Sequence, residues 1–183
     1  GRLAEKKGVT YLISALKSVV NEFPDCKLVI VGDGPEKQAL VRQVQQLGLG
    51  GNVVFAGSLP NKELPPYYRA ADVFVLPSIV DSRGDTEGLG VVLLEAIAAG
   101  TPVIASSVGG IPDIVLNKKT GLLVGQKNPE QLAVAIIKLL KSPSLGKKLS
   151  AAAKAHIAKS YSWQRIGSEF QSLFSSVLSR KKK

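Results

Sequence analysis

The residues best suited to hold a charged ligand lie in one short segment, Glu87 to Glu95, where two carboxylates bracket two glycines. The glycines carry no side chain that could block an approaching group. If a helix begins here, its first backbone N–H groups lack helical acceptors and lie at the positive end of the helix dipole. These groups belong to Gly88, Leu89, Gly90 and Val91. The segment therefore predicts a phosphate-binding turn with an acidic side chain on either flank.

The two carboxylates are spaced so that one molecule could touch both. On a continuous helix, Glu87 and Glu95 would differ by about 80° in azimuth and by roughly 12 Å along the axis. The intervening run Val91 to Leu94 is apolar, which indicates that the helix packs on a sheet and leaves Glu95 partly buried. A partly buried carboxylate needs partners, and ribose hydroxyls would supply them. The alternative is that Glu87 caps the helix and Glu95 extends to solvent.

The elements around this segment alternate short β-rich apolar runs with amphipathic helical stretches. This pattern is typical of a parallel sheet covered on both faces, so we expect a Rossmann-like, doubly wound α/β fold. Such folds bind ligands beyond the carboxyl ends of their strands. The expected strands are Lys27 to Val31, Val53 to Ala56, Val73 to Leu76, Val103 to Ala105 and Gly121 to Val124. The expected helices between them are Val9 to Glu22, Glu36 to Leu47, Asn61 to Ala71, Gly90 to Ala99 and Pro129 to Lys141.

Two further helices are expected after the last strand, Ser144 to Lys159 and Trp163 to about Leu178. Such a tail packs outside the sheet or reaches another lobe. The chain shows no internal repeat or linker, so residues 1–183 are expected to form a single domain. Gly1 and Arg2 look like residues that directly follow a strand. We therefore expect the chain to be one lobe of a longer protein.

The amino-acid composition limits the classes of ligand that the chain could bind. The net charge of +10 suits nucleic acid, anionic lipid or a phosphate-bearing small molecule. Aromatic residues are few and are not interleaved with basic patches, which argues against nucleic acid. The run Arg180 to Lys183 is a short solvated tail or a contact with an anionic membrane surface. Asp81 and Asp85 lack the further ligands of a metal site, so none is expected. With the lone Cys26 and no signal peptide or membrane-spanning run, we expect a cytoplasmic protein.

The string TEGLGVVLLEAIAAGTP, residues 86–102, resembles the signature of two glutamates separated by seven residues in retaining glycosyltransferases of the GT-B fold, notably family four. Other strings of the same family occur here in the same order. They are GRLAEKKG, VIVGDGP, VVFAGSLPNKEL, YYRAADVFVLPS, GTPVIASSVGGIPDIV, TGLLV and YSW. The ordered set covers almost the whole chain and resembles the donor-binding C-terminal lobe.

The resemblance implies specific roles for four charged residues. Glu87 would contact the transferred sugar near the reaction centre, as the catalytic residue, and Glu95 would bind the ribose hydroxyls of the nucleotide. Arg2 and Lys7 match the family's basic positions that hold the donor diphosphate. Charge-assisted hydrogen bonds are worth about 1.5 to 3 kcal/mol each, against roughly 0.3 to 1 kcal/mol for a helix dipole. These two cations are therefore expected to dominate diphosphate affinity.

Weaker matches extend the donor site. Gly32 would let the backbone pass close to the donor, and Ser58 and Leu59 resemble the strip that meets the base. Gly109 and Gly110 resemble a loop beside the donor, although a plain turn before Pro112 explains them nearly as well.

The implied activity is retaining, metal-independent transfer of a hexose from a UDP- or GDP-sugar to an acceptor hydroxyl, without a cofactor. An N-terminal acceptor-binding lobe would be missing here, so this chain alone would bind nucleotide and transfer sugar poorly or not at all. A nucleotide-sugar epimerase or glycan phosphorylase lobe, and a noncatalytic nucleotide-binding module, stay open as alternatives. The base, the sugar, the acceptor and the linkage depend on loop shape and on the absent lobe.

Overall fold

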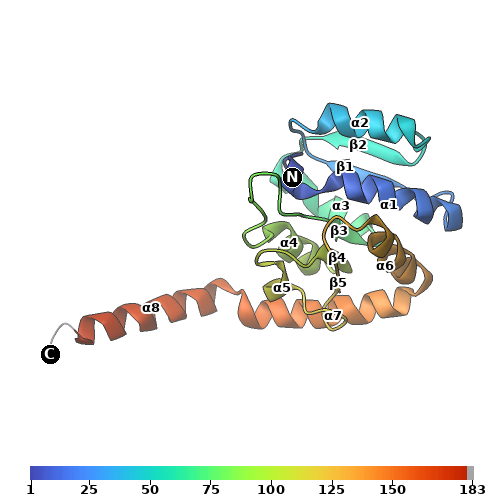
Figure 1. Cartoon of the computed structure of the whole chain (residues 1–183). Helices are drawn as coiled ribbons and strands as arrows, with labels where there is room; N and C mark the ends of the chain where they lie inside the picture. Colours follow the sequence, from blue (N-terminus) through green and yellow to red (C-terminus); the bar gives the residue numbers. More distant parts are fainter. Residues whose placement is uncertain (181–183) are drawn as a thin grey trace.

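The computed structural model describes residues 1–180 and shows an α/β body from which one helix projects (Figure 1). The strands are β1 (Leu28–Val31), β2 (Val53–Gly57), β3 (Phe74–Leu76), β4 (Val103–Ser106) and β5 (Leu122–Val124). The helices are α1 (Val9–Glu22), α2 (Lys37–Gln46), α3 (Leu64–Ala70), α4 (Val91–Ala99), α5 (Ile111–Ile114), α6 (Pro129–Lys141), α7 (Pro143–Ser160) and α8 (Trp163–Arg180). Two short 3-10 turns, η1 (Glu5–Lys7) and η2 (Asn61–Glu63), precede α1 and α3.

All paired strands run parallel, which confirms the predicted α/β class. They form two sheets, β1-β2 and β3-β4-β5, whereas a single sheet was expected. One hydrophobic core nevertheless joins the two sheets, because Ile30 of β1 and Ile104 of β4 belong to the same buried cluster. Helices α1 and α6 contact each other within this cluster and contribute buried leucines to it. The two sheets are therefore joined through a shared hydrophobic core.

A second buried cluster holds α4 against the three-stranded sheet. Leu93, Ala96 and Ile97 of α4 are completely buried and pack with Val103 and Leu76. Helix α7 supports the far end of α4, where the Ser150 hydroxyl donates a 2.6 Å hydrogen bond to the Gly100 carbonyl. The start of α4 is thereby fixed relative to the carboxyl ends of β3 and β4.

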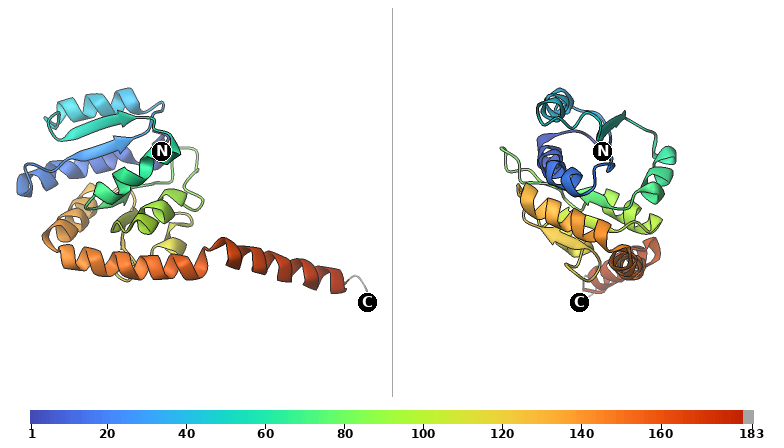
Figure 2. Two further views of the ribbon diagram at one scale, coloured as in Figure 1. Left: turned by 180° about the vertical axis from the view of Figure 1, so that it is seen from behind. Right: turned by 90° about the vertical axis from the view of Figure 1, so that its right-hand side faces the viewer.

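Helix α8 projects away from the body in Figure 1 and in the left view of Figure 2. Its apolar side chains are exposed, with 85% exposure at Trp163 and 63% at Phe174. Helix α7 packs on the body, as expected of a tail outside the sheet, whereas α8 does not. That the tail reaches another lobe stays a prediction. Within the described residues, no helix has the length and apolar character needed to cross a membrane. The run Arg180 to Lys183, predicted to be a solvated tail or a contact with an anionic membrane surface, lies largely in residues 181–183, outside the described part.

Candidate functional site

The opening segment of the chain lies directly against the loop that follows β3. The Ile79 N–H donates a 2.9 Å hydrogen bond to the Lys6 carbonyl. Gly8 has a φ of +62°, and a side chain on it would overlap the Pro77 carbonyl, so only glycine permits this approach. The 3-10 turn of residues 5–7 consequently presents its lysines to the segment between Pro77 and Gly90.

Lys7 and Glu87 form the most buried ion pair of this region. The ammonium Nζ lies 2.5 Å from Glu87 Oε2, and the two side chains are only 20% and 15% exposed. The hydroxyl of the fully buried Ser78 lies 3.4 Å from the same oxygen. The structure therefore brings two predicted site residues together, with one carboxylate oxygen engaged and Oε1 free of hydrogen bonds within residues 1–180.

The neighbouring Lys6 pairs outward with Asp85 at 2.8 Å. This hydrogen bond raises the pKa of Lys6 and lowers the pKa of Asp85 below their ordinary values. Asp85 is exposed and Lys6 is partly exposed, so solvent screens the pair and it contributes little to stability. Lys7 and Lys6 are adjacent in the sequence but face different acids, and only Lys7 points toward the predicted site.

The start of α4 differs in one respect from the expectation. The helix begins at Val91, preceded by Gly90 with a φ of +77°, so Glu87 lies before the helix. The predicted 80° relation between the two glutamates, which assumed one continuous helix, is therefore wrong. Of the four predicted donors, Val91 begins the helix, whereas Gly88, Leu89 and Gly90 precede it. Within residues 1–180, no backbone N–H from Gly88 to Val92 donates a hydrogen bond.

Gly109 and Gly110, on the loop after β4, pack against the backbone of this turn. The Gly110 N–H donates a 3.0 Å hydrogen bond to the Gly88 carbonyl. A side chain on Gly109 would overlap the Glu87 carbonyl, and one on Gly110 would overlap the Gly88 carbonyl. Gly88 itself has open space where a side chain would be. The turn is held by backbone contacts on one side and is open on the other.

Glu95 is exposed, so the prediction that it is partly buried is wrong. Helix α4 buries only the stripe of Leu93, Ala96 and Ile97, and Glu95 lies on another face of the helix. The Tyr68 hydroxyl of α3 donates a 2.7 Å hydrogen bond to Glu95 Oε2. Burial, followed by this bond to the carboxylate, raises the pKa of Tyr68, which keeps its hydroxyl protonated. The sequence carried no signal for this pairing, because the two residues lie 27 positions apart.

The backbone nitrogen of Gly1 lies at the carboxyl end of β1. It donates a 2.7 Å hydrogen bond to the Val31 carbonyl at the end of β1. The adjacent Arg2 is exposed, and its guanidinium makes no hydrogen bond or ion pair in residues 1–180.

The weaker predicted contacts lie at the same edge of the fold. The Gly32 N–H donates a 2.7 Å hydrogen bond to the Gly57 carbonyl, which brings the ends of β1 and β2 together. A side chain on Gly32 would overlap the Gly1 carbonyl, so packing within the chain already requires this glycine. Ser58 is exposed and Leu59 half-buried just after β2. Their contact with a donor stays a prediction.

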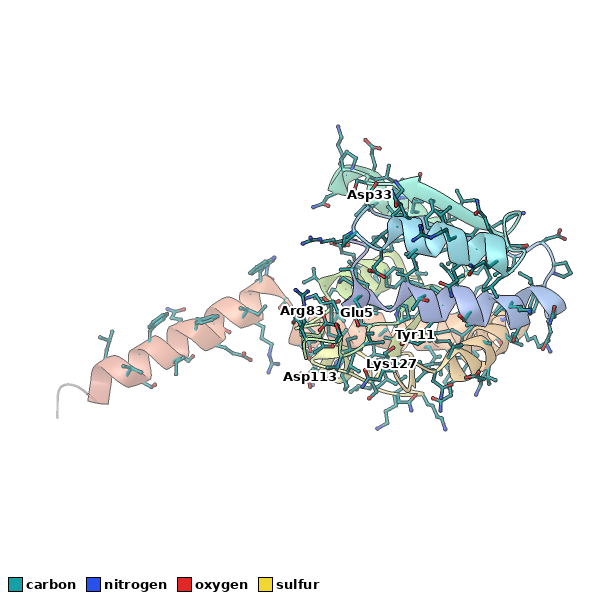
Figure 3. All side chains as sticks on the ribbon, turned by 45° about the horizontal axis from the view of Figure 1, so that its top comes forward. Glu5, Tyr11, Asp33, Arg83, Asp113 and Lys127 are labelled. Carbon is teal, nitrogen blue, oxygen red and sulfur yellow. The ribbon has the colours of Figure 1, made fainter. Side chains whose placement is uncertain are left out.

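The loop between β3 and Glu87 is organised by a buried carboxylate. Asp81 accepts 2.9 Å hydrogen bonds from the N–H groups of Arg83 and Asp85. Glu5 holds the same loop by accepting from the Ser82 hydroxyl at 2.7 Å, and Figure 3 labels Glu5 and Arg83 in this region. Across the described part of the chain, no three acidic, histidine or cysteine side chains gather into a possible metal site.

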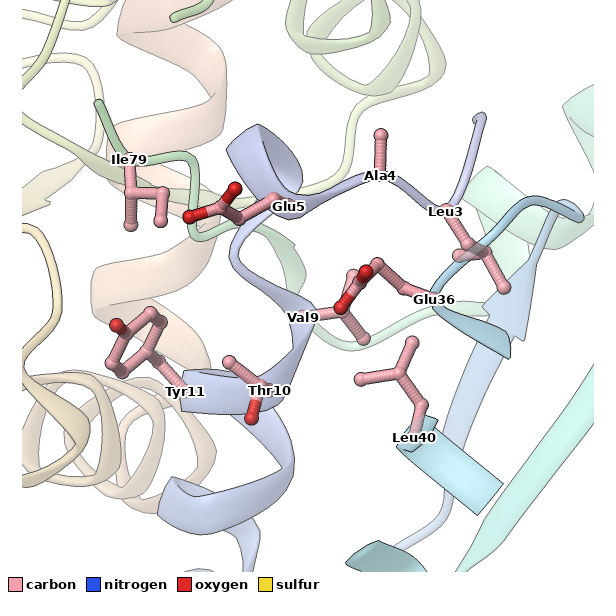
Figure 4. A pocket seen from close by; sticks show the side chains of 9 residues that line it. All are labelled: Leu3, Ala4, Glu5, Val9, Thr10, Tyr11, Glu36, Leu40 and Ile79. Carbon is pink, nitrogen blue, oxygen red and sulfur yellow. The ribbon is translucent and has the colours of Figure 1, made fainter. Parts of the chain in front are cut away.

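A separate small cavity lies behind the opening segment, between α1, α2 and Ile79 (Figure 4). Its volume is about 60 Å³, and its walls combine Glu5 and Glu36 with apolar side chains such as Leu40. The cavity has room for a few water molecules and is too small for a nucleotide. It does not contain Glu87, Glu95 or Lys7.

Comparison with known proteins shows the family of the chain. The family described as "Glycosyl transferases group 1" matches residues 1–156. A curated relative, the GDP-mannose-dependent alpha-(1-6)-phosphatidylinositol monomannoside mannosyltransferase of Mycolicibacterium smegmatis, is 37% identical over 175 residues. The match covers 95% of this chain and 46% of that protein. The chain thus spans about half the length of the curated relatives it matches.

Solved structures show the same similarity. The C-terminal domain of a glycosyl transferase group 1 family protein from Francisella tularensis superposes with a TM-score of 0.79 at 29% identity, covering 89% of this chain and 84% of that one. The Anabaena protein HepE in complex with UDP superposes with a TM-score of 0.86 at 26% identity, covering 96% of this chain and 47% of that one.

Proposed function

Because the chain belongs to the family of group 1 glycosyl transferases, we propose that it is the donor-binding lobe of a glycosyltransferase. The enzyme would move a sugar from a UDP- or GDP-sugar to an acceptor hydroxyl. The names of the relatives support both nucleotides, since one relative is GDP-mannose-dependent and one structural neighbour is a UDP complex. The acceptor would be held by a further lobe, in keeping with relatives of about twice this length.

One observation carries the proposal. The unpaired N–H groups from Gly88 to Val92 lie in the turn that leads into α4 and in the first residues of that helix, and Lys7 and Glu87 lie beside them. Five consecutive backbone N–H groups without protein acceptors, residues 88–92, would offer donors to an anion at the positive end of a helix. A nucleoside diphosphate fits this arrangement, because its charge would meet the donors while its ribose reached Glu95.

The same residues suggest how the leaving group is stabilised. When the sugar departs, negative charge grows on the diphosphate, and fixed donors oriented toward it lower the barrier without reorganising. Arg2 has no partner within residues 1–180 and is free to bind a phosphate. Lys7 would bridge the diphosphate and Glu87. These groups would supply the positive charge that a metal provides in other enzymes.

Glu87 would act on the sugar. Its Oε2 is held by Lys7 and approached by Ser78, which orients the carboxylate and leaves Oε1 for the ligand. An ionised carboxylate at this place would position the sugar and stabilise the positive charge that develops on its anomeric carbon. We propose that transfer retains the anomeric configuration, with donor and acceptor on the same face of the sugar.

A binding experiment with this chain tests the first step. Isothermal titration of UDP, GDP and their hexose conjugates should show saturable binding for at least one nucleotide. Inorganic pyrophosphate should bind more weakly, because it lacks the ribose that would reach Glu95. Glu95→Ala should bring the affinity for the nucleotide toward that for pyrophosphate. A folded sample that binds none of these ligands would refute the proposal.

A further inference from the structure

Tyr68 is fixed in the fold by three independent contacts besides its bond to Glu95. Its ring packs edge-on against Phe74 of β3, with ring centroids 5.4 Å apart and planes inclined by 65°. The Thr101 hydroxyl donates to the Tyr68 carbonyl at 2.5 Å. Helix α3, which carries Tyr68, packs on α4. The phenol oxygen is therefore held at a defined place relative to the sheet and to α4.

Glu95 has no such support of its own. Its side chain is exposed, forms no ion pair, and accepts a hydrogen bond only from Tyr68 within residues 1–180. A glutamate side chain has three rotatable bonds, so an exposed one samples many rotamers and loses that freedom when a ligand fixes it. A hydroxyl donating to a carboxylate at 2.7 Å is a charge-assisted hydrogen bond and is stronger than one between neutral groups.

From this geometry we infer that Tyr68 is a positioning residue, which orients the Glu95 carboxylate before the nucleotide arrives. With Oε2 engaged by the phenol, the other carboxylate oxygen and the remaining lone pair face the ligand as acceptors for vicinal ribose hydroxyls. Tyr68 does not touch the ligand in this arrangement. The inference rests on the proposed function, because it needs Glu95 to bind the ribose.

The expected effect is modest and specific. Tyr68→Phe keeps the ring that packs on Phe74 and removes only the hydroxyl. In that variant the Glu95 side chain must be fixed when the nucleotide binds, and this ordering lowers the affinity by about 2- to 12-fold. We expect this loss for whichever of UDP and GDP binds. A 2′,3′-dideoxynucleoside diphosphate with the same base should bind equally well to both proteins, because it offers Glu95 no hydroxyl.

The experiment is a double-mutant cycle by isothermal titration, with Tyr68→Phe, Glu95→Ala and the double variant, using the ribose and dideoxyribose nucleotides. Tyr67→Phe is the matched control, because Tyr67 is next to Tyr68 in α3 and its hydroxyl makes no hydrogen bond within the described residues. Thermal melting followed by circular dichroism verifies that each variant is folded. The positioning role requires that Tyr68→Phe cause no further loss once Glu95 has been replaced.

Three results would overturn the inference. Unchanged nucleotide affinity in Tyr68→Phe, while Glu95→Ala weakens binding, would show that Glu95 needs no positioning. A loss that persists in the Glu95→Ala background, or that is equal for the dideoxy nucleotide, would show that the hydroxyl acts through the fold. Nucleotide binding that Glu95→Ala does not weaken would remove the ribose role of Glu95 and the positioning role together, while leaving the diphosphate site intact.

Discussion

Replacing Gly110 by alanine tests whether the turn at Gly88 is held in place by the loop after β4. The backbone of Gly110 has a φ of −84°, outside the left-handed region that favours glycine. The new methyl group would overlap the Gly88 carbonyl, and its next neighbours are other backbone atoms of Gly88 and Leu89. To restore a normal carbon–oxygen contact, the turn must retreat by about 1 Å. The substitution therefore acts directly on the proposed phosphate donors.

Two costs follow from this displacement. The 3.0 Å hydrogen bond from the Gly110 N–H to the Gly88 carbonyl is lost, at about 0.5 to 1.5 kcal/mol. Overpacking adds about 1 to 3 kcal/mol. The sum of about 1.5 to 4.5 kcal/mol lowers the melting temperature by about 3 to 18 °C for a chain of this size. If one hydrogen bond to the diphosphate is also lost, nucleoside diphosphate affinity falls by at least about tenfold.

Gly100→Ala is the matched control for this prediction. Gly100 has a φ of +93° and open space around its missing side chain, so alanine costs about 1 to 2 kcal/mol through backbone strain alone. It lies at the other end of α4. Titration of UDP and GDP well below the melting temperatures should show weakened binding for Gly110→Ala and unchanged binding for Gly100→Ala. Unchanged binding in Gly110→Ala, or equal losses in both, would refute the role given to the turn.

Further predictions concern the charged residues of the site. In the parent enzyme, Glu95→Ala should mainly weaken nucleotide affinity, whereas Glu87→Ala should mainly slow turnover; equal, negligible effects in steady-state kinetics would remove both roles. Lys7→Met should weaken nucleoside diphosphate binding by about 10- to 100-fold, and titration of the isolated chain tests this. Pairing with Lys6 holds the pKa of Asp85 below its ordinary 3.8, so the stabilisation is complete above pH 3.8 and is lost as the pH falls through the lower, folded-state pKa. Because the pair contributes little to overall stability, the direct measurement is an NMR titration of the Asp85 carboxyl, whose pKa should rise toward its ordinary value in Lys6→Met; an unchanged pKa would contradict the assignment.

Regular elements with strong local signals were predictable from the sequence. Helices α1 and α6 have the expected bounds, because each combines an amphipathic period with clear ends. At the start of α6, the Asn128 side chain accepts from the Gln131 N–H, and Pro129 occupies the first turn. The turn η1 and helix α5 were not predicted, since three and four residues are too short to show a period.

The exposure of Glu95 was not predictable in the same way. A run of apolar residues before it indicated a helix buried on most sides, but Val91 in that run is 57% exposed. Which face of α4 is covered depends on where α3 and α7 pack, and this is set by contacts distant in the sequence. The division of the strands into two sheets has the same origin, because strand pairing is non-local. Glu87 and Lys7, 80 positions apart, were joined only through family resemblance.

The rigidity of the site follows from where its glycines lie. Gly8, Gly109 and Gly110 each let one backbone segment touch the carbonyl of another, at Pro77, Glu87 and Gly88 respectively. Backbone contacts of this kind hold a segment more firmly than flexible side chains do, because few torsions can move to relieve them. They hold the turn through its carbonyl groups, so the N–H groups from Gly88 to Val92 stay unpaired. A turn that is held through its carbonyl groups, with its N–H groups unpaired, needs little reorganisation when an anion binds. Because Gly110→Ala would displace this turn, it should weaken anion binding by more than the loss of folded protein alone would cause.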